Sequence, residues 1–279
     1  MFVHHEVVDG VGIAFTDRHG GVSRPPYDSL NLGRSDRDDP SAVVQNLRRV
    51  RHALSERSPA PVRAVVTVRQ EHTAQVVDLD GLDPAAPDLA DWDDLSTVGD
   101  ATPGRPQLPC ADAIVTGTPG VALAVRVADC LPVLLAAPTA GVVAAVHAGR
   151  VGLADGILPA AVAKVRRRAT AHGAPGDVPV RAWIGPAVCA ACYEVPASLR
   201  DEVAARVPDV AATTSWGTPS LDLAGGAAAQ LAALGVTSSR IGRCTRTDPD
   251  LFSHRRDGDA AGRQAGLVWV VEDGSLRDN

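Results

Sequence analysis

Short runs of Val, Leu, Ile and Ala, bounded by Gly, Pro or Asp, recur along most of the chain. Runs of this length are typical of β-strands, and runs without polar alternation are typical of strands that are buried on both faces. The pattern predicts strands at Val11–Thr16, Val62–Val68, Val121–Ala128, Val133–Ala136, Val142–Val146, Val180–Ile184 and Leu267–Val271.

Four other segments carry helix signals. Asp38-Asp39-Pro40 combines capping side chains with a proline suited to the first turn, so a helix is predicted from there to about Leu54. Glycine commonly follows a helix C-terminus, and Gly173 and Gly235 end two further segments in this way. The remaining helices are predicted at Leu158–His172, Ala197–Val207 and Asp222–Leu234.

These strands and helices alternate without a strict strand–helix–strand rhythm, which favours an α+β fold with mixed sheets over a doubly wound one. No domain boundary is apparent, so residues 1–279 are predicted to form a single domain. Residues 80–109 are rich in Asp, Pro and Gly and show little periodicity. This segment is predicted to be a loop-rich, poorly ordered excursion on the surface.

Composition and charge exclude several classes of protein. A content of 45% hydrophobic and 22% charged residues excludes a wholly disordered chain, and a net charge of −6 argues against a nucleic-acid-binding protein. The most apolar stretch, 121–146, is interrupted by Arg126, Asp129 and two prolines, which argues against a membrane span. With no signal peptide apparent and five cysteines that we expect to be reduced, a cytoplasmic location is predicted.

Three residues with reactive or metal-binding side chains stand where apolar strands end, namely His72, Cys130 and His147. Two imidazoles and one thiolate would suit zinc and leave a fourth position open, although their spacing matches no local zinc motif. Alternatively, Cys130 and His147 could form a nucleophilic thiolate–imidazolium pair. The third interpretation is two partly buried histidines and a core cysteine without any chemical role.

Other polar segments are weaker candidates. The glycine-containing turn of residues 147–152 would let backbone N–H groups approach an anion, with Arg150 adding a charge, or it could simply be a tight turn. Asn31 could either hold its own turn or direct its amide at a ligand. The Cys189-Ala190-Ala191-Cys192 segment has no second cysteine pair at zinc-ribbon spacing, and two incidental thiols are favoured over a redox or metal role.

Taken together, motifs from nearly the whole chain resemble one family. It is the purine nucleoside phosphorylase family formerly labelled multicopper polyphenol oxidase (laccase), also called peptidoglycan editing factor. The matching segments are Gly20–Ser23, Tyr27–Gly33, Gln70 with His72, Ala111–Ala113, Ala128–Val133, Val146–Gly149, Ile184–Pro186, Cys192–Val195, Ser253, Arg255–Asp257 and Gly262–Gly266.

The resemblance implies mixed sheets layered between helices and a zinc site formed by His72, Cys130 and His147. It also implies phosphorolysis of adenosine, inosine and methylthioadenosine, with adenosine deamination as a companion activity. Asn31, Gln70 and Arg150 are then predicted to bind the substrate. The partners would be the nucleoside and phosphate, and nothing in the sequence indicates the oligomeric state.

Two positions depart from the pattern of the family. The usual motif is His-Ala-Gly-Trp-Arg-Gly, whereas this chain has Arg150 and Val151 at the two variable places, so the arginine is shifted by one residue. The usual glycine after the first histidine is Thr73. Because neighbouring residues can face opposite directions, the role of Arg150 is an open question at the level of sequence.

The older laccase label can be tested by counting ligands. A blue-copper centre commonly has an axial Met and a trinuclear cluster needs many histidines, but the only Met is Met1 and no His-x-His pair occurs. A four-copper centre is therefore not expected, while a single copper ion on the trio is compatible with its donors. Two alternatives to the phosphorylase remain: a Cys/His hydrolase or amidase acting on peptidoglycan precursor peptides, and a non-enzymatic metal-containing binding protein.

Overall fold

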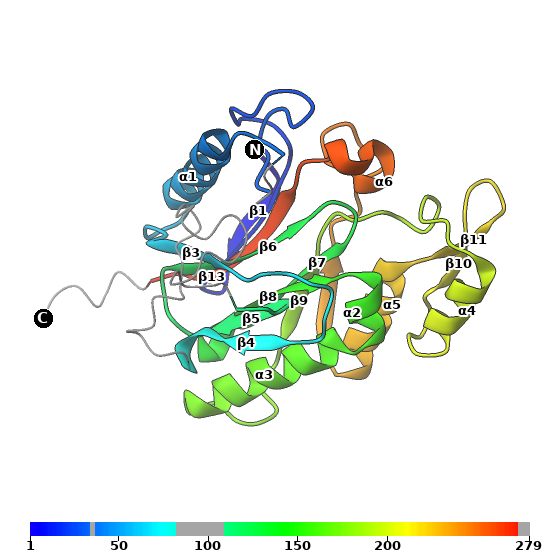
Figure 1. Ribbon diagram of the computed structural model, residues 1–279. Helices are drawn as coiled ribbons and strands as arrows, with labels where there is room; N and C mark the ends of the chain where they lie inside the picture. The colour runs from blue at the N-terminus through cyan, green and yellow to red at the C-terminus, as the bar shows by residue number, and fades with distance from the viewer. Residues whose placement is uncertain (34–36, 82–108, 273–279) are drawn as a thin grey trace, which may run out of the picture.

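Two stacked β-sheets form the centre of the molecule in a computed structural model that describes residues 1–33, 37–81 and 109–272 (Figure 1). Within these residues, the first sheet has the strand order β1 (Phe2–Val8), β2 (Val11–Thr16), β13 (Gln264–Val270), β6 (Val121–Val127) and β3 (Ala64–Thr67). The second sheet has the order β12 (Thr237–Arg240), β9 (Arg181–Ile184), β7 (Leu131–Ala137), β8 (Val142–Ala148), β5 (Ala113–Thr116) and β4 (Val76–Asp78). Both sheets mix parallel and antiparallel pairs: β3–β6, β9–β12 and β4–β5 are parallel.

The position of the central strand β8 explains why its sequence is almost entirely apolar. Every residue of β8 is buried, and successive side chains of a strand point to opposite faces. Val142, Ala144 and Val146 pack into a core shared with helices, whereas Val143 and Ala145 pack into the core between the two sheets. A strand covered on both faces needs apolar residues along its length, and in β8 the one polar side chain is His147 near its end.

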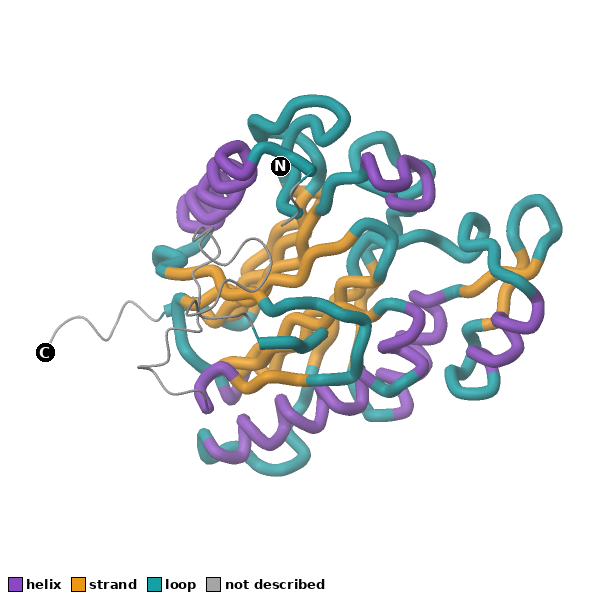
Figure 2. Tube along the Cα trace, in the orientation of Figure 1, coloured by secondary structure: helices purple, strands orange, loops and turns teal. Residues whose placement is uncertain are grey.

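Helices cover the outer faces of both sheets (Figure 2). On the first sheet, α1 (Pro40–Arg57) packs through Val43, Leu47 and Leu54, and Asp39 caps it by accepting a 2.8 Å hydrogen bond from the Ser41 N–H. The second sheet is covered by α2 (Arg150–Ala154), α3 (Ile157–Ala171) and α5 (Leu223–Ala233). The other elements are α4 (Ala197–Ala204), α6 (His254–Asp257), the hairpin β10 (Ala211–Thr213) and β11 (Pro219–Leu221), and the 3₁₀ turns η1 (Leu79–Gly81), η3 (Pro138–Ala140) and η4 (Gly258–Ala260).

The predicted α+β class, with mixed sheets layered between helices, is confirmed. Each predicted strand and helix has a counterpart at nearly the same residues, and β2 matches at both ends. Several strands were not predicted. β12 is Thr-Ser-Ser-Arg at the edge of its sheet and lacks an apolar run, whereas β5, Ala-Ile-Val-Thr, is a short buried apolar run that was missed. No described helix is both long and apolar enough to span a bilayer.

Part of the expected loop-rich excursion at 80–109 cannot be compared, since residues 82–108 lie outside the described residues. The single domain over residues 1–279 stays a prediction.

Candidate functional site

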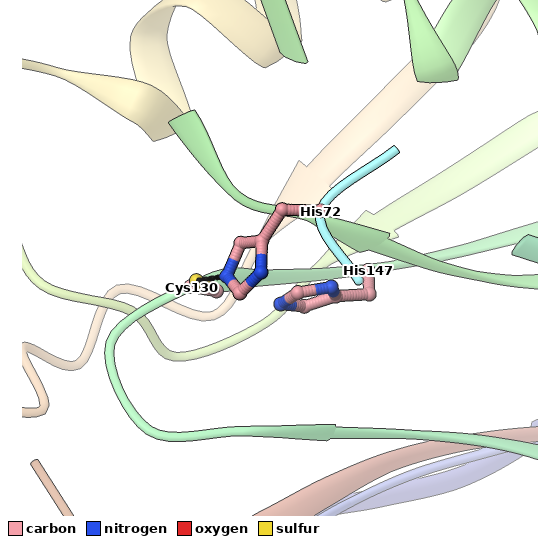
Figure 3. A group of neighbouring side chains, drawn as sticks. All are labelled: His72, Cys130 and His147. Carbon is pink, nitrogen blue, oxygen red and sulfur yellow. Dashed lines mark hydrogen bonds between the residues drawn. The ribbon is translucent and has the colours of Figure 1, made fainter. Parts of the chain in front are cut away.

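His72, Cys130 and His147 lie next to one another although they come from three separate segments (Figure 3). Cys130 immediately precedes β7, His147 lies in β8, and His72 follows β3 of the other sheet. Because Pro132 of β7 pairs with His147, Cys130 is only two residues from the partner of this histidine. The donor atoms of the three residues all lie within 4.8 Å of one another, and Cys130 Sγ is 3.6 Å from His72 Nε2.

The buried carboxylate of Asp112 holds both histidines of this cluster. It accepts a hydrogen bond of 2.7 Å from His147 Nδ1 and one of 3.0 Å from the backbone N–H of His72. It also accepts bonds of 3.2 and 2.6 Å from the N–H groups of Glu71 and Thr73, and one of 2.9 Å from the Thr73 hydroxyl. Since a carboxylate only accepts, Nδ1 of His147 carries a proton, so Nε2 is the nitrogen that can bind a metal ion once it is deprotonated.

The charges of the cluster are coupled. Burial acts to raise the pKa of the Cys130 thiol, but hydrogen bonds to His147 and His72 outweigh it and lower this pKa to about 6. Burial likewise opposes the charged form of His147, yet hydrogen bonds to Asp112 and Cys130 raise its pKa to about 9. Burial also acts against ionisation of Asp112, and the bonds from His147 and Thr73 hold the pKa of that carboxyl well below its usual range. In the absence of a metal ion, the site therefore favours a thiolate at Cys130 beside an imidazolium at His147.

These donors fit a metal ion. One thiolate and two imidazoles are common zinc ligands, and a carboxylate bonded to the second nitrogen of a ligating histidine is a frequent companion of such sites. Gly149 lies against the cluster, and a Cβ there would stand 2.7 Å from His72 Cδ2 and 3.3 Å from Cys130 Sγ. A side chain at this position would push the donors apart. The same set is compatible with a single copper ion.

A cavity of about 440 Å³ opens beside Cys130. It combines a cationic part, formed by Arg150 and Arg255, with apolar surface from Val188 and Leu223. Its walls consist of Ala128, Asp129, Cys130, Arg150, Val188, Tyr193, Leu223, His254 and Arg255. The Arg255 guanidinium lies 4.8 Å above the ring of Tyr193. An anion and an apolar group can therefore be bound side by side next to the thiol.

Asp129 anchors the turn that carries Cys130. Its backbone has a φ of 91°, a left-handed conformation that is uncommon outside glycine. Its carboxylate accepts bonds of 2.6 Å from the Thr245 hydroxyl, 2.7 Å from the Ser253 hydroxyl and 2.6 Å from the Arg255 N–H. These bonds join the turn before β7 to the segment that supplies His254 and Arg255 to the cavity.

Sequence reasoning assigned no role to Asp112 or Asp129. The available signal was a charged residue within or next to an apolar run, as in Ala111-Asp112-Ala113 and Ala128-Asp129-Cys130. A charge at such a place is costly unless it is paired, so it indicates partners from elsewhere in the chain.

The three predicted substrate-binding residues occupy different places. Arg150 is the first residue of α2 and lines the cavity, despite its shift along the chain. The Gln70 amide exchanges hydrogen bonds of 2.8 and 2.9 Å with the backbone of Arg126 in β6. The buried Asn31 donates to Asp38 at 2.8 Å and accepts from the N–H groups of Gly33 and Arg263 at 2.8 and 2.9 Å, so its amide holds its own turn. Binding roles for all three stay predictions.

The amino-acid sequence is similar to one family of proteins along most of its length. The model of the family described as multi-copper polyphenol oxidoreductase laccase matches residues 12–271. The purine nucleoside phosphorylase SCO2081 of Streptomyces coelicolor is 45% identical, over 97% of this chain and 100% of its own length. The purine nucleoside phosphorylase YlmD of Geobacillus stearothermophilus is 35% identical, over 95% of this chain and 92% of its own.

Solved structures show the same fold. The crystal structure of YlmD has a TM-score of 0.75 at 30% identity and covers 94% of this chain and 93% of that one. The protein NMB0706 of Neisseria meningitidis has a TM-score of 0.73 at 31% identity and covers 96% and 99% of the two chains. The chain thus belongs to the family described as multi-copper polyphenol oxidoreductase laccase.

Proposed function

We propose that this chain is a zinc-associated purine nucleoside phosphorylase. It converts adenosine, inosine or methylthioadenosine and phosphate into the free base and the sugar-1-phosphate, with adenosine deamination as a companion activity. The observation that carries the proposal is that Cys130 of the His/Cys/His cluster and the cationic Arg150 line one cavity. The names of the curated relatives support the same activity.

In phosphorolysis a phosphate oxygen attacks the anomeric carbon of the ribose while the bond from this carbon to the purine nitrogen breaks. The bonding electron pair leaves with the base. Arg150 and Arg255 are proposed to hold the phosphate, since guanidinium groups bind its oxygens through paired hydrogen bonds. Val188 and Leu223 offer apolar contact to the nucleoside. His72 or His147 is proposed to assist the departing purine from within the cluster, and the proton that neutralises this base is taken from solvent.

His72, Cys130 and His147 are proposed to hold the zinc ion. When bound there, zinc supplies Lewis acidity, which polarises an atom of the substrate or a water molecule. Asp112 keeps His147 in the tautomer that can ligate. Asn31 and Gln70 are proposed to contribute to substrate binding by fixing nearby loops; the Asn31 amide holds the backbone of Arg263, whose side chain interacts electrostatically with Cys130. The five cysteines are unpaired, which supports a reducing, cytoplasmic environment.

The direct test incubates the purified protein with adenosine in the presence and absence of phosphate and separates the products by chromatography. Adenine and ribose-1-phosphate are expected only with phosphate. Inosine and ammonia, formed by the addition of water to adenosine, are expected with or without it. If neither product set appears at high enzyme concentration, the proposal is wrong.

Replacing Arg150 by alanine tests the anion site. The KM for phosphate is expected to rise roughly 10- to 100-fold, because one charge-assisted hydrogen bond contributes about 1.5–3 kcal/mol. The substitution Arg150→Lys should restore part of the affinity, and Arg200→Ala on the outlying α4 should leave the KM unchanged. An unchanged phosphate KM in Arg150→Ala would show that this arginine does not meet the anion.

A second candidate function rests on the 3.6 Å distance between Cys130 Sγ and His72 Nε2, with His147 held by Asp112. A thiolate between imidazoles could attack an amide, as in a hydrolase that edits peptidoglycan precursor peptides. Release of an amino acid from a UDP-muramyl peptide, in the absence of phosphorolysis, would favour this alternative.

A further inference from the structure

Three cysteines outside the site described above also lie together. The sulfur atoms of Cys189, Cys192 and Cys244 are all within 4.8 Å of one another. Within the described residues, this is the second of two groups of side chains with a geometry suited to a metal ion, and it consists of sulfur alone. None of the three forms a disulfide.

The topology of the second sheet explains why residues so distant in sequence meet here. Strands β9 and β12 are parallel neighbours, with Ile184 opposite Arg240, so the segments that follow them leave the sheet at the same edge. The two segments continue side by side through a bridge between Ala187 and Cys244. The fold thereby delivers Cys244 to the segment that carries Cys189 and Cys192.

Local hydrogen bonds arrange the three thiols for a common ligand. The N–H groups of Cys192 and Tyr193 donate to the carbonyl oxygen of Cys189 at 2.9 and 3.0 Å and fold the CxxC segment into a turn. The Cys189 N–H in turn donates to Cys244 Sγ at 3.4 Å. An N–H donor directed at sulfur favours the thiolate, which is the form that binds metal ions.

We propose that Cys189, Cys192 and Cys244 form a second metal site that binds Zn²⁺ through three thiolates, with the thiol protons released to solvent. Thiolates select soft or borderline ions such as zinc. A Zn–S distance of about 2.3 Å corresponds to roughly 3.8 Å between sulfur atoms in a tetrahedral site, so a small rotation of the side chains closes the site. This proposal does not depend on the phosphorylase activity.

The place of the site indicates a structural role. Val188 and Tyr193, which line the cavity, adjoin the CxxC segment, and Thr245, which binds Asp129, follows Cys244. A zinc ion that joins the two segments would hold this wall of the cavity together. Zinc here would therefore stabilise the protein even where the His/Cys/His site is disabled.

The experiment uses Cys130→Ala, in which the other site has lost its only thiol. After metal removal and reloading with Co²⁺ under a reductant, thiolate-to-cobalt charge-transfer absorption in the near ultraviolet is expected from this variant. Adding the substitutions Cys189→Ser, Cys192→Ser and Cys244→Ser should abolish the band. A separate variant carries only the three Cys→Ser substitutions and keeps Cys130. After reloading with Zn²⁺, elemental analysis of this triple variant should show one ion fewer per chain than the wild type.

Cys110→Ser serves as the matched control, since it removes an exposed thiol outside both clusters and should change neither measurement. Absence of the cobalt band in Cys130→Ala would overturn the proposal, and this result does not depend on whether the triple variant folds. An equal zinc content in wild type and a folded triple variant would overturn it as well. The proposal would also be overturned if the native protein were isolated without zinc, with a disulfide between Cys189 and Cys192, and took up no metal ion.

Discussion

Replacing Cys130 by alanine is expected to remove one zinc ion per chain and to lower adenosine phosphorolysis by more than about 100-fold. Mutating a group that merely supports a metal ligand typically costs about 10- to 100-fold in affinity or activity, so loss of the ligand itself should cost more. Cys130 lies in a turn before β7 and is only partly buried, so the fold should survive the loss of one sulfur atom. Zinc content by elemental analysis, circular dichroism and the adenosine assay together check this result.

His72→Ala and His147→Ala are expected to give the same loss of zinc and activity, because the three donors lie within 4.8 Å of one another. Cys110→Ala should keep wild-type zinc and activity. Wild-type zinc content in all three ligand variants would show that His72, Cys130 and His147 do not share a metal ion.

Asp112→Asn is expected to lower both the stability of the fold and the affinity for zinc. This substitution keeps the size of the side chain and removes its charge. The amide has only one oxygen to accept the donors that the carboxylate now satisfies, and its NH₂ group would face N–H groups. We expect a loss of about 3 to 5 kcal/mol in the free energy of unfolding, the range measured when one partner of a buried ion pair is removed. Zinc affinity should fall about 10- to 100-fold, because His147 loses its orienting partner.

Urea denaturation of the metal-free protein measures the free energy of unfolding, and competition with a chelator measures the zinc affinity. Asp80→Asn is a suitable control: Asp80 accepts bonds from the Gly117 N–H and the Thr118 hydroxyl and lies outside the metal-binding cluster. This control should lower stability and leave zinc affinity unchanged. If Asp112→Asn binds zinc as tightly as the wild type, Asp112 has only a structural role.

Much of the fold could be predicted because apolar runs and their Gly, Pro and Asp boundaries are local properties. The strand Val11–Thr16 has both signals and was predicted at both ends. Strand β12, with its Thr-Ser-Ser-Arg sequence, has glycines near both ends but no apolar run. An edge strand is held by its hydrogen bonds to β9 rather than by an apolar face. The prediction missed β12 because pairing with β9, rather than local composition, produces this strand.

The sequence by itself determined the layered α+β class, the trio of donors at strand ends and the scarcity of Met and His that argues against a four-copper centre. Only the tertiary structure decided which side chains meet. Asp112 became the partner of His147, Arg150 came to line the cavity despite its shift, and Cys244 joined the CxxC segment. The physical reason is that the register of β7 with β8 and the parallel pairing of β9 with β12 set these contacts between residues far apart in the chain.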